Sequence, residues 1–176
     1  MLFDPTMVQS DYRSPLGRII LAATDSGLAG LWFDDQRHLP SKTVADKWPE
    51  QPKHALLHQA KAELDEYFAG QRRQFSLPLD LRSGTLFQQS VWRALLSIEP
   101  GQTSSYDAIS AITGRPTAFR ACGAAIGRNP VSIIVPCHRV IGANGSLTGY
   151  AGGLARKTAL LRLEGAACVE PQESLI

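Results

Sequence analysis

A chain of 176 residues is long enough to bury a hydrophobic core, either as one compact domain or as two small ones. Its apolar content of 44% includes no apolar run near the roughly 20 residues that a membrane-spanning helix needs. The opening segment MLFDPTMVQSDYRSP lacks the pattern of a secretory signal, and three cysteines without close spacing fit a reducing compartment. We therefore expect a cytoplasmic protein that makes no membrane contact.

The net charge of +2 is unevenly distributed along the chain. Residues 1–83 carry 10 basic and 11 acidic side chains, a net of −1, whereas residues 84–176 carry 8 basic and 5 acidic side chains, a net of +3. Between Gly101 and Leu163, seven Arg and Lys residues face only Asp107. Such a stretch attracts a polyanion, although charge alone leaves a solvated basic face as the alternative.

The first half of the chain alternates strand-like and helical patterns. Residues 18–23 and 28–33 are rich in Ile, Leu and aromatic residues, and the TDSG between them has turn composition, so they predict a β-hairpin. Residues 34–52 are polar and contain prolines, which predicts a mobile loop. Residues 53–69 repeat apolar side chains at helical spacing, and residues 75–81 fit a further strand.

Helical patterns dominate the second half. Residues 85–98 predict a helix with one apolar face, and Ser104 can cap a short helix that ends near residue 112. A second short helix follows over residues 117–127 after a glycine-containing turn, which is the arrangement of a helix-turn-helix. Residues 132–135 then predict a short extended segment that leads into a PCHR sequence.

A Gly-rich loop and a last helix over residues 154–163 complete the predicted elements. The order of elements predicts an α+β fold class. We expect two domains, an N-terminal α+β domain over residues 1–83 and a C-terminal, mainly helical domain over residues 84–176.

The helix predicted after the glycine turn has two unlike faces. At 100° per residue, Phe119, Cys122 and Ile126 cluster on one side, which makes Cys122 a packing residue. The opposite side is basic but otherwise carries short side chains, as suits close approach to a DNA groove; close packing against another helix is the alternative. It is formed by Thr117, Arg120, Ala121, Ala124, Gly127 and Arg128.

Cys137 stands in a setting typical of a reactive site, between a proline and a His-Arg pair, at the end of an apolar segment. A free thiol with a pKa near 8.5 needs a base or a positive neighbour to become a nucleophile. His138 is the nearest base, and Glu164 is a candidate to orient it. Because adjacent residues of an extended chain point in opposite directions, a bridging water between Cys137 and His138 is favoured over direct contact. A purely structural Cys-His pair is the alternative.

His54 and His58 have helical spacing, but no carboxylate or cysteine is placed to complete a metal shell. We expect neither a metal nor a cofactor.

Several motifs between Phe87 and Gly165 together resemble one family. They are FQQSVW, SSYDAIS, FRACGAA, NPVSIIVPCHRVIG, GYAGG and RLEG. The string PCHRVIG in this company closely resembles the methylated-DNA:protein-cysteine methyltransferases, also called alkylguanine-DNA alkyltransferases. The resemblance implies an N-terminal ribonuclease-H-like domain with a small antiparallel sheet and a helix, and a C-terminal winged-helix-like domain with a helix-turn-helix.

The resemblance also implies direct-reversal DNA repair. The alkyl group on the six-position oxygen of guanine, and also the four-position oxygen of thymine, would pass irreversibly to Cys137 in a single turnover after the base is flipped out of the duplex. His138 would take the thiol proton through a water, Glu164 would hold the His138 tautomer, and Asn129 would brace the turn that carries the cysteine.

Further roles implied by the resemblance concern DNA and the base. Arg120 would replace the flipped base in the stack, and Tyr106 would press on the neighbouring phosphate and hydrogen-bond the base. Backbone groups of Cys137, Val140 and Ala151 would recognise the guanine edge, with Tyr150 as a pocket wall. The second short helix would enter the minor groove of double-stranded DNA. It would contact DNA through Thr117, Arg120, Ala121, Ala124, Gly127 and Arg128.

The sequence departs from some relatives in three respects. All three cysteines lie beyond residue 120, so we expect no N-terminal structural zinc. Ser132 replaces a proline and Ala151 a serine, which bears on the alkyl groups that fit. We expect a monomer, associated with the nucleoid when bound, and leave clustering on DNA open.

Two functions from other classes were weighed against this one. A lesion reader or helix-turn-helix regulator would bind DNA without transferring anything, and Cys137 counts against it. A cysteine hydrolase would use Cys137, His138 and Glu164 as a triad, which would leave the basic helix face without a purpose.

Overall fold

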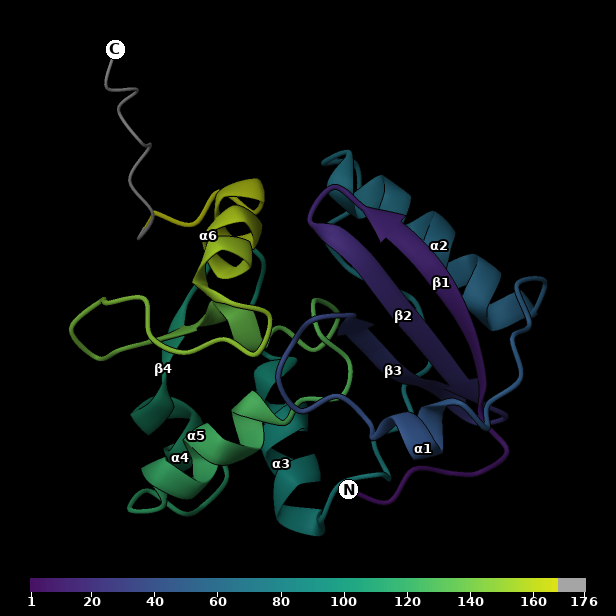
Figure 1. Cartoon of the computed structure of the whole chain (residues 1–176). Coiled ribbons are helices and arrows are strands. Elements are labelled where there is room, and N and C mark those ends of the chain that lie inside the picture. The colour runs from purple at the N-terminus through teal and green to yellow at the C-terminus, as the bar shows by residue number, and fades with distance from the viewer. Residues whose placement is uncertain (168–176) are drawn as a thin grey trace.

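The computed structural model describes residues 1–167. Its first half holds a three-stranded antiparallel sheet in the order β1-β2-β3, with one long helix packed on the sheet (Figure 1). The elements are β1 (Val8–Ser14), β2 (Gly17–Thr24), β3 (Gly27–Phe33) and α2 (Ala55–Phe68). The hairpin and the helix predicted from the sequence are confirmed. Within the described part of the chain, no helix combines the length and apolar character needed to cross a membrane.

Strand β1 was not predicted. It pairs along its whole length with β2, from Val8 opposite Ala23 to Ser14 opposite Gly17. Its buried positions are Ser10 and Tyr12, so the strand carries too few apolar side chains to produce a hydrophobic alternation. The Tyr12 hydroxyl donates a hydrogen bond to Asp65 of α2 at 2.7 Å, which ties this edge strand to the helix.

Residues 34–52 are more ordered than the mobile loop that their composition predicts. They contain a one-turn helix, α1 (Lys42–Ala45). Trp48 is buried and stacks on Trp32 of β3 with ring centroids 6.2 Å apart, and the Gln9 side chain donates to the Trp48 carbonyl at 2.9 Å. The buried Trp48 therefore helps to order a segment whose other residues are mostly polar.

The strand predicted over residues 75–81 does not form. Only an isolated bridge between Leu28 and Leu79 is present, because Leu28 donates to the Pro78 carbonyl and accepts from the Asp80 amide. Pro78 has no amide hydrogen to extend the ladder.

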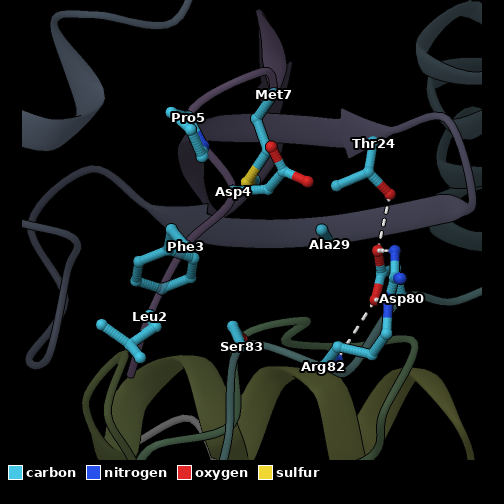
Figure 2. Close-up of a pocket in the computed structure, with 10 residues that line it drawn as sticks. All are labelled: Leu2, Phe3, Asp4, Pro5, Met7, Thr24, Ala29, Asp80, Arg82 and Ser83. Atoms are coloured by element: carbon cyan, nitrogen blue, oxygen red, sulfur yellow. Dashed lines mark hydrogen bonds and ion pairs between the residues drawn. The ribbon is translucent and has the colours of Figure 1, made fainter.

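The connection between the halves is anchored beside the sheet (Figure 2). Asp80 accepts hydrogen bonds from Thr24 at 2.6 Å and from the Arg82 guanidinium at 2.7 Å, and these contacts hold the pKa of Asp80 well below its usual range. These residues line a pocket, and the start of the chain lines it too. The Leu2 amide donates a hydrogen bond to the Ser83 carbonyl there.

Three helices open the second half and pack on one another (Figure 1). They are α3 (Leu86–Leu95), α4 (Tyr106–Ile112) and α5 (Phe119–Gly127). Thr85 and Gln88 form a reciprocal capping box at the start of α3. Ser105, not Ser104, caps α4 by accepting from the Ala108 amide at 3.2 Å. The predicted helix-turn-helix is present.

Two details of α5 differ from the sequence prediction. Thr117 lies in the turn before the helix. Phe119 was expected in the core but is 48% exposed at the first position of the helix. Cys122, Ala125 and Ile126 form the buried face, as predicted for Cys122 and Ile126.

The segment that leads to Cys137 turns instead of extending. Residues 132–134 form a turn in which Ile133 has a φ of +70°, so the predicted extended segment is wrong. A 3-10 helix, η1 (Cys137–Arg139), follows directly. Short parallel strands β4 (Ser104–Ser105) and β5 (Val140–Ile141), which the sequence did not reveal, then fix the chain before the last helix, α6 (Leu154–Leu163).

One buried core joins the two halves. The Leu31 amide of β3 donates to the Pro130 carbonyl at 2.9 Å, and the Ser132 amide donates to the Leu31 carbonyl at 3.0 Å. The same apolar cluster contains Leu31, Trp92 and Cys137. The sheet therefore supports the turn that presents the cysteine.

Candidate active site

Cys137 lies at the start of η1 and is only 5% exposed. Its Sγ accepts a hydrogen bond from the Asn129 side-chain amide at 3.1 Å. Burial raises the pKa of the Cys137 thiol, and the Asn129 hydrogen bond and the charge of Lys157 offset part of that rise. The resting group is a neutral thiol that needs a base before it can attack.

Asn129 braces the turn around the cysteine. Its side-chain amide nitrogen also donates to the Val135 carbonyl at 2.7 Å, and its oxygen accepts from the Val131 amide at 3.0 Å. Asn129 is 4% exposed, so all of these bonds are formed away from water. The sequence-based expectation that Asn129 supports this turn matches these contacts.

Glu164 follows α6 and is the hub of a buried network. Its Oε1 accepts from the Tyr67 hydroxyl at 2.7 Å and lies 2.9 Å from His138 Nε2. Arg139 donates to both carboxylate oxygens, from Nε at 2.8 Å and from Nη2 at 2.9 Å. Arg139 and His138 hold the pKa of Glu164 well below its usual range despite burial.

Tyr67 and Arg139 were not identified as site residues from the sequence. Tyr67 comes from α2, 97 positions before its partner Glu164, and no local pattern reveals such a pairing. Arg139 lies next to the motif histidine, and its side chain also donates to the Ile98 carbonyl. It supplies the positive charge that keeps Glu164 ionised in the interior.

His138 is fully buried, and burial is the main cause that lowers its pKa. Since Glu164 is ionised, His138 Nε2 carries the proton that lies between them, and Nδ1 carries the lone pair. Nδ1 is buried and has no hydrogen-bond partner among the described residues. A neutral imidazole with an available Nδ1 is the protonation state that a general base requires.

A pocket of about 140 Å³ opens onto the cysteine. It is lined by Arg37, His38, Tyr106, Gly123, Ile126, Gly127, Cys137, Gly149, Tyr150 and Ala151. Residues 37 and 38 follow β3, so the N-terminal half contributes one wall. This contribution was not predicted, because His38 lies in a polar loop with no recognisable motif.

Of three residues predicted to form the pocket, two line it and one does not. Tyr150 and Ala151 line the pocket, and burial raises the pKa of Tyr150 well above its usual value. Val140 is fully buried and is not among the lining residues; its carbonyl accepts from Lys157 Nζ at 2.5 Å. Lys157, which the sequence did not single out, also donates to the Thr148 carbonyl at 2.7 Å and so shapes the loop before Tyr150.

The short-side-chain face of α5 borders this pocket. Arg120, Ala121 and Ala124 are exposed, as are Thr117 and Arg128 on either side, and Gly127 is half-buried. Tyr106 at the start of α4 lines the pocket, and its hydroxyl donates to the Thr148 carbonyl at 3.2 Å. Of the other cysteines, Cys122 is packed in the core and Cys168 lies outside the described residues.

The fold and the site together define a helix-turn-helix protein with a buried cysteine at a pocket beside its second helix. Two family models match the chain: the 6-O-methylguanine DNA methyltransferase ribonuclease-like domain over residues 7–81, and the DNA binding domain of the same family over residues 86–166. The chain therefore belongs to the 6-O-methylguanine DNA methyltransferase family.

Known relatives agree with this membership. A methylated-DNA--protein-cysteine methyltransferase of Mycobacterium leprae is 50% identical over 151 residues, which cover 86% of this chain and 88% of the relative. The crystal structure of the Mycobacterium tuberculosis O6-methylguanine methyltransferase superposes with a TM-score of 0.80 at 46% identity, covering 96% of this chain and 97% of that one. A structure of the Mycobacterium tuberculosis OGT in complex with DNA gives 0.78 at 45% identity, covering 93% and 96%.

Proposed function

We propose that this protein repairs DNA by direct reversal, moving an alkyl group from the six-position oxygen of guanine to Cys137 Sγ. The observation that carries the proposal is the position of Cys137 on a small pocket beside the exposed face of α5. Family membership and a relative whose structure contains DNA support the same function. The four-position oxygen of thymine offers a similar alkyl ether and is a second substrate of the same chemistry.

The buried network supplies the base. His138 Nδ1 accepts the Cys137 proton through one water, while Glu164 holds the Nε2 proton and stabilises the imidazolium that forms. The thiolate attacks the alkyl carbon, a sulfur-carbon bond forms, and the carbon-oxygen bond breaks. The electron pair stays on the guanine oxygen, and the base regains a proton from water. The thioether has no good leaving group, so each molecule acts once.

Double-stranded DNA is the partner, and we place α5 in its minor groove. The face with Arg120, Ala121 and Ala124 is exposed and carries short side chains next to the pocket mouth. Flipping the damaged base costs a few kcal/mol, and Arg120 entering the stack offsets part of that cost. Thr117, Gly127 and Arg128 extend the contact to the flanking phosphates.

Base recognition falls to the pocket rim. Tyr106 borders the pocket mouth and is placed to bond the base, Tyr150 forms a wall, and the backbone of Cys137 and Ala151 faces the guanine edge. Val140, which the resemblance also implied, is buried behind the pocket with its carbonyl bonded to Lys157 and takes no part. In this proposal the chain works as a cytoplasmic monomer. Residues 1–83 support the site, and residues 84–176 bind DNA and carry out the transfer.

Mass spectrometry of the protein after incubation with duplex DNA that bears one isotopically labelled methylguanine tests this function. We expect the label on the peptide that contains Cys137. Cys137→Ser should bind the duplex but take up no label, because a hydroxyl is a far weaker nucleophile at neutral pH. Cys122→Ser is the matched control at a second buried cysteine and should retain transfer. Label on any other residue would refute the assignment.

A further inference from the structure

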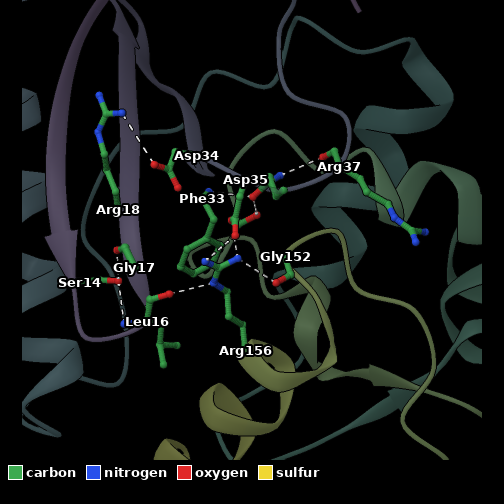
Figure 3. Close-up of polar contacts among 12 residues, drawn as sticks. Ser14, Leu16, Gly17, Arg18, Phe33, Asp34, Asp35, Arg37, Gly152 and Arg156 are labelled. Atoms are coloured by element: carbon green, nitrogen blue, oxygen red, sulfur yellow. Dashed lines mark hydrogen bonds and ion pairs between the residues drawn. The ribbon is translucent and has the colours of Figure 1, made fainter.

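Arg156 connects the last helix to the N-terminal half through an unusually complete set of contacts (Figure 3). It lies in the first turn of α6. Its Nε donates to the Leu16 carbonyl at 2.9 Å, in the turn between β1 and β2. Its Nη1 and Nη2 reach the Asp35 carboxylate at 2.6 and 3.3 Å, and Nη1 also donates to the Gly152 carbonyl at 3.1 Å.

The guanidinium also stacks on an aromatic ring. Its central carbon lies 4.3 Å from the centroid of Phe33, the last residue of β3. A planar guanidinium can form a forked ion pair, two carbonyl contacts and a ring contact at once, whereas a lysine ammonium cannot reproduce this geometry. Arg156 is 18% exposed in its side chain, and its ion pair lowers the pKa of the exposed Asp35.

These contacts converge on the loop that walls the cysteine pocket. The Arg37 amide donates to the Ala151 carbonyl at 3.0 Å, directly beside the Gly152 carbonyl held by Arg156. Gly152 is wedged so tightly that an added Cβ would lie 2.9 Å from the Tyr150 ring and 3.1 Å from the Phe33 ring. Residues 150–152 are therefore clasped between α6 and the chain that follows β3.

We propose that Arg156 is a positioning residue through which residues 33–37 set the width of the alkyl pocket, and that it thereby determines which alkyl groups are transferred. The inference rests on the proposed function, because it assumes that Tyr150 and Ala151 wall the alkyl group. We call the contacts of Arg156 with Asp35 and with the Leu16 and Gly152 carbonyls the clasp. When the clasp is closed, these walls hold a small alkyl carbon against Cys137 Sγ. When it is open, the loop can move and a bulky group gains room.

The expected result is a change in selectivity and not a uniform loss. In Arg156→Ala, the rate of methyl transfer from duplex DNA should fall about tenfold, because small displacements of reacting atoms are costly. Transfer of a benzyl group from the same duplex sequence should fall much less. The ratio of benzyl to methyl rates should therefore rise at least about threefold, with Arg156→Lys intermediate.

Two further single variants and one double variant make the test specific. Asp35→Ala removes the ionic partner at an exposed carboxylate, and it should raise the same ratio by a smaller factor. It carries the test if Arg156→Ala fails to fold. Combined with Arg156→Ala it should add nothing, because both changes open one contact. Arg82→Ala is the control, since Arg82 forms a comparable forked pair with Asp80 away from residues 33–37 and should leave the ratio unchanged.

Single-turnover rates and the final fraction of alkylated Cys137 are measured for both duplexes with each variant. A general loss of folded protein would lower the alkylated fraction for both duplexes and leave the ratio of rates at the wild-type value. If the wild type transfers normally but the ratio of benzyl to methyl rates is unchanged in Arg156→Ala and Asp35→Ala, the role of Arg156 in selectivity is overturned and the proposed function stands. Absence of alkylated Cys137 in the wild type would instead overturn the proposed function.

Discussion

The interior around Cys137 and the exposed face of α5 are built on opposite principles. In the interior, Glu164 accepts from three side chains, and Asn129 and Arg139 are likewise bonded within the protein. On the α5 face, Arg120, Ala121 and Ala124 are exposed to solvent. The difference separates chemistry from recognition. A change in the interior should disturb proton transfer and the stability of the fold together. A change on the α5 face should lower the repair of duplex DNA and leave the reaction with a free base unchanged.

The largest effect is expected in the interior, from Glu164→Gln. An amide cannot hold the His138 tautomer and stabilise its charged form, so the transfer rate should fall by about a hundredfold, the lower range of general-base contributions. Single-turnover transfer from a free alkylguanine base measures the rate without any requirement for DNA binding. An unchanged rate would contradict the role of Glu164.

Loss of the fold is the competing explanation for that result, because the change leaves Arg139 without its carboxylate. Tyr67→Phe separates the two. It removes one hydrogen bond to Glu164 and keeps the charge and the shape. We expect it to slow transfer only by a few-fold with a normal circular dichroism spectrum.

The next effect is expected on the exposed face, from Arg120→Ala. Repair of duplex DNA should fall about tenfold, since nothing then replaces the flipped base in the stack. Reaction with a free alkylguanine base should be unchanged, because that reaction needs no flipping. Equal losses on both substrates would place Arg120 in the pocket or the fold and would remove the distinction between the two regions.

The smallest effect concerns acid stability, to which the interior contributes and the exposed α5 face does not. The pKa of Glu164 lies below its ordinary value of 4.5 in the folded state, so its carboxylate stabilises the fold above pH 4.5, and this contribution is lost as the pH falls further. The pKa of His138 is also lowered in the folded state, so the unfolded chain takes up a proton first as the pH falls below 6.5.

Melting temperatures measured between pH 7 and pH 3 should therefore decline for the wild type, and Glu164→Gln should decline less steeply below pH 4.5. Arg120→Ala should follow the wild-type curve. Parallel curves for the wild type and Glu164→Gln would show that the carboxylate contributes nothing to acid sensitivity.

The sequence predicted elements whose signal is local. The apolar face of α3, its Thr85 capping box and the two-sided character of α5 depend on residues within a few positions of one another. Strand β1 was missed because Ser10 and Tyr12 occupy its buried positions. The turn at residues 132–134 was missed because apolar residues in sequence favour an extended segment, whereas the Ser132 amide bonds the Leu31 carbonyl of β3, which lies far away in the sequence.

The same distinction applies to the site. Cys137, His138 and Asn129 were identified because they lie within one short motif. Glu164 was a candidate to orient His138 from the sequence alone, but its partners Tyr67 and Arg139 follow only from the tertiary fold. The contribution of residues 37 and 38 to the pocket likewise depends on how the sheet meets the second half.

The central claim is that Cys137 accepts one alkyl group and cannot release it. Its most direct test is a titration of methylguanine duplex against a fixed amount of protein, with repaired lesions and the mass of the Cys137 peptide followed together. We predict a plateau at one repaired lesion and one added methyl group per chain. Repaired lesions in clear excess over protein molecules would contradict the claim.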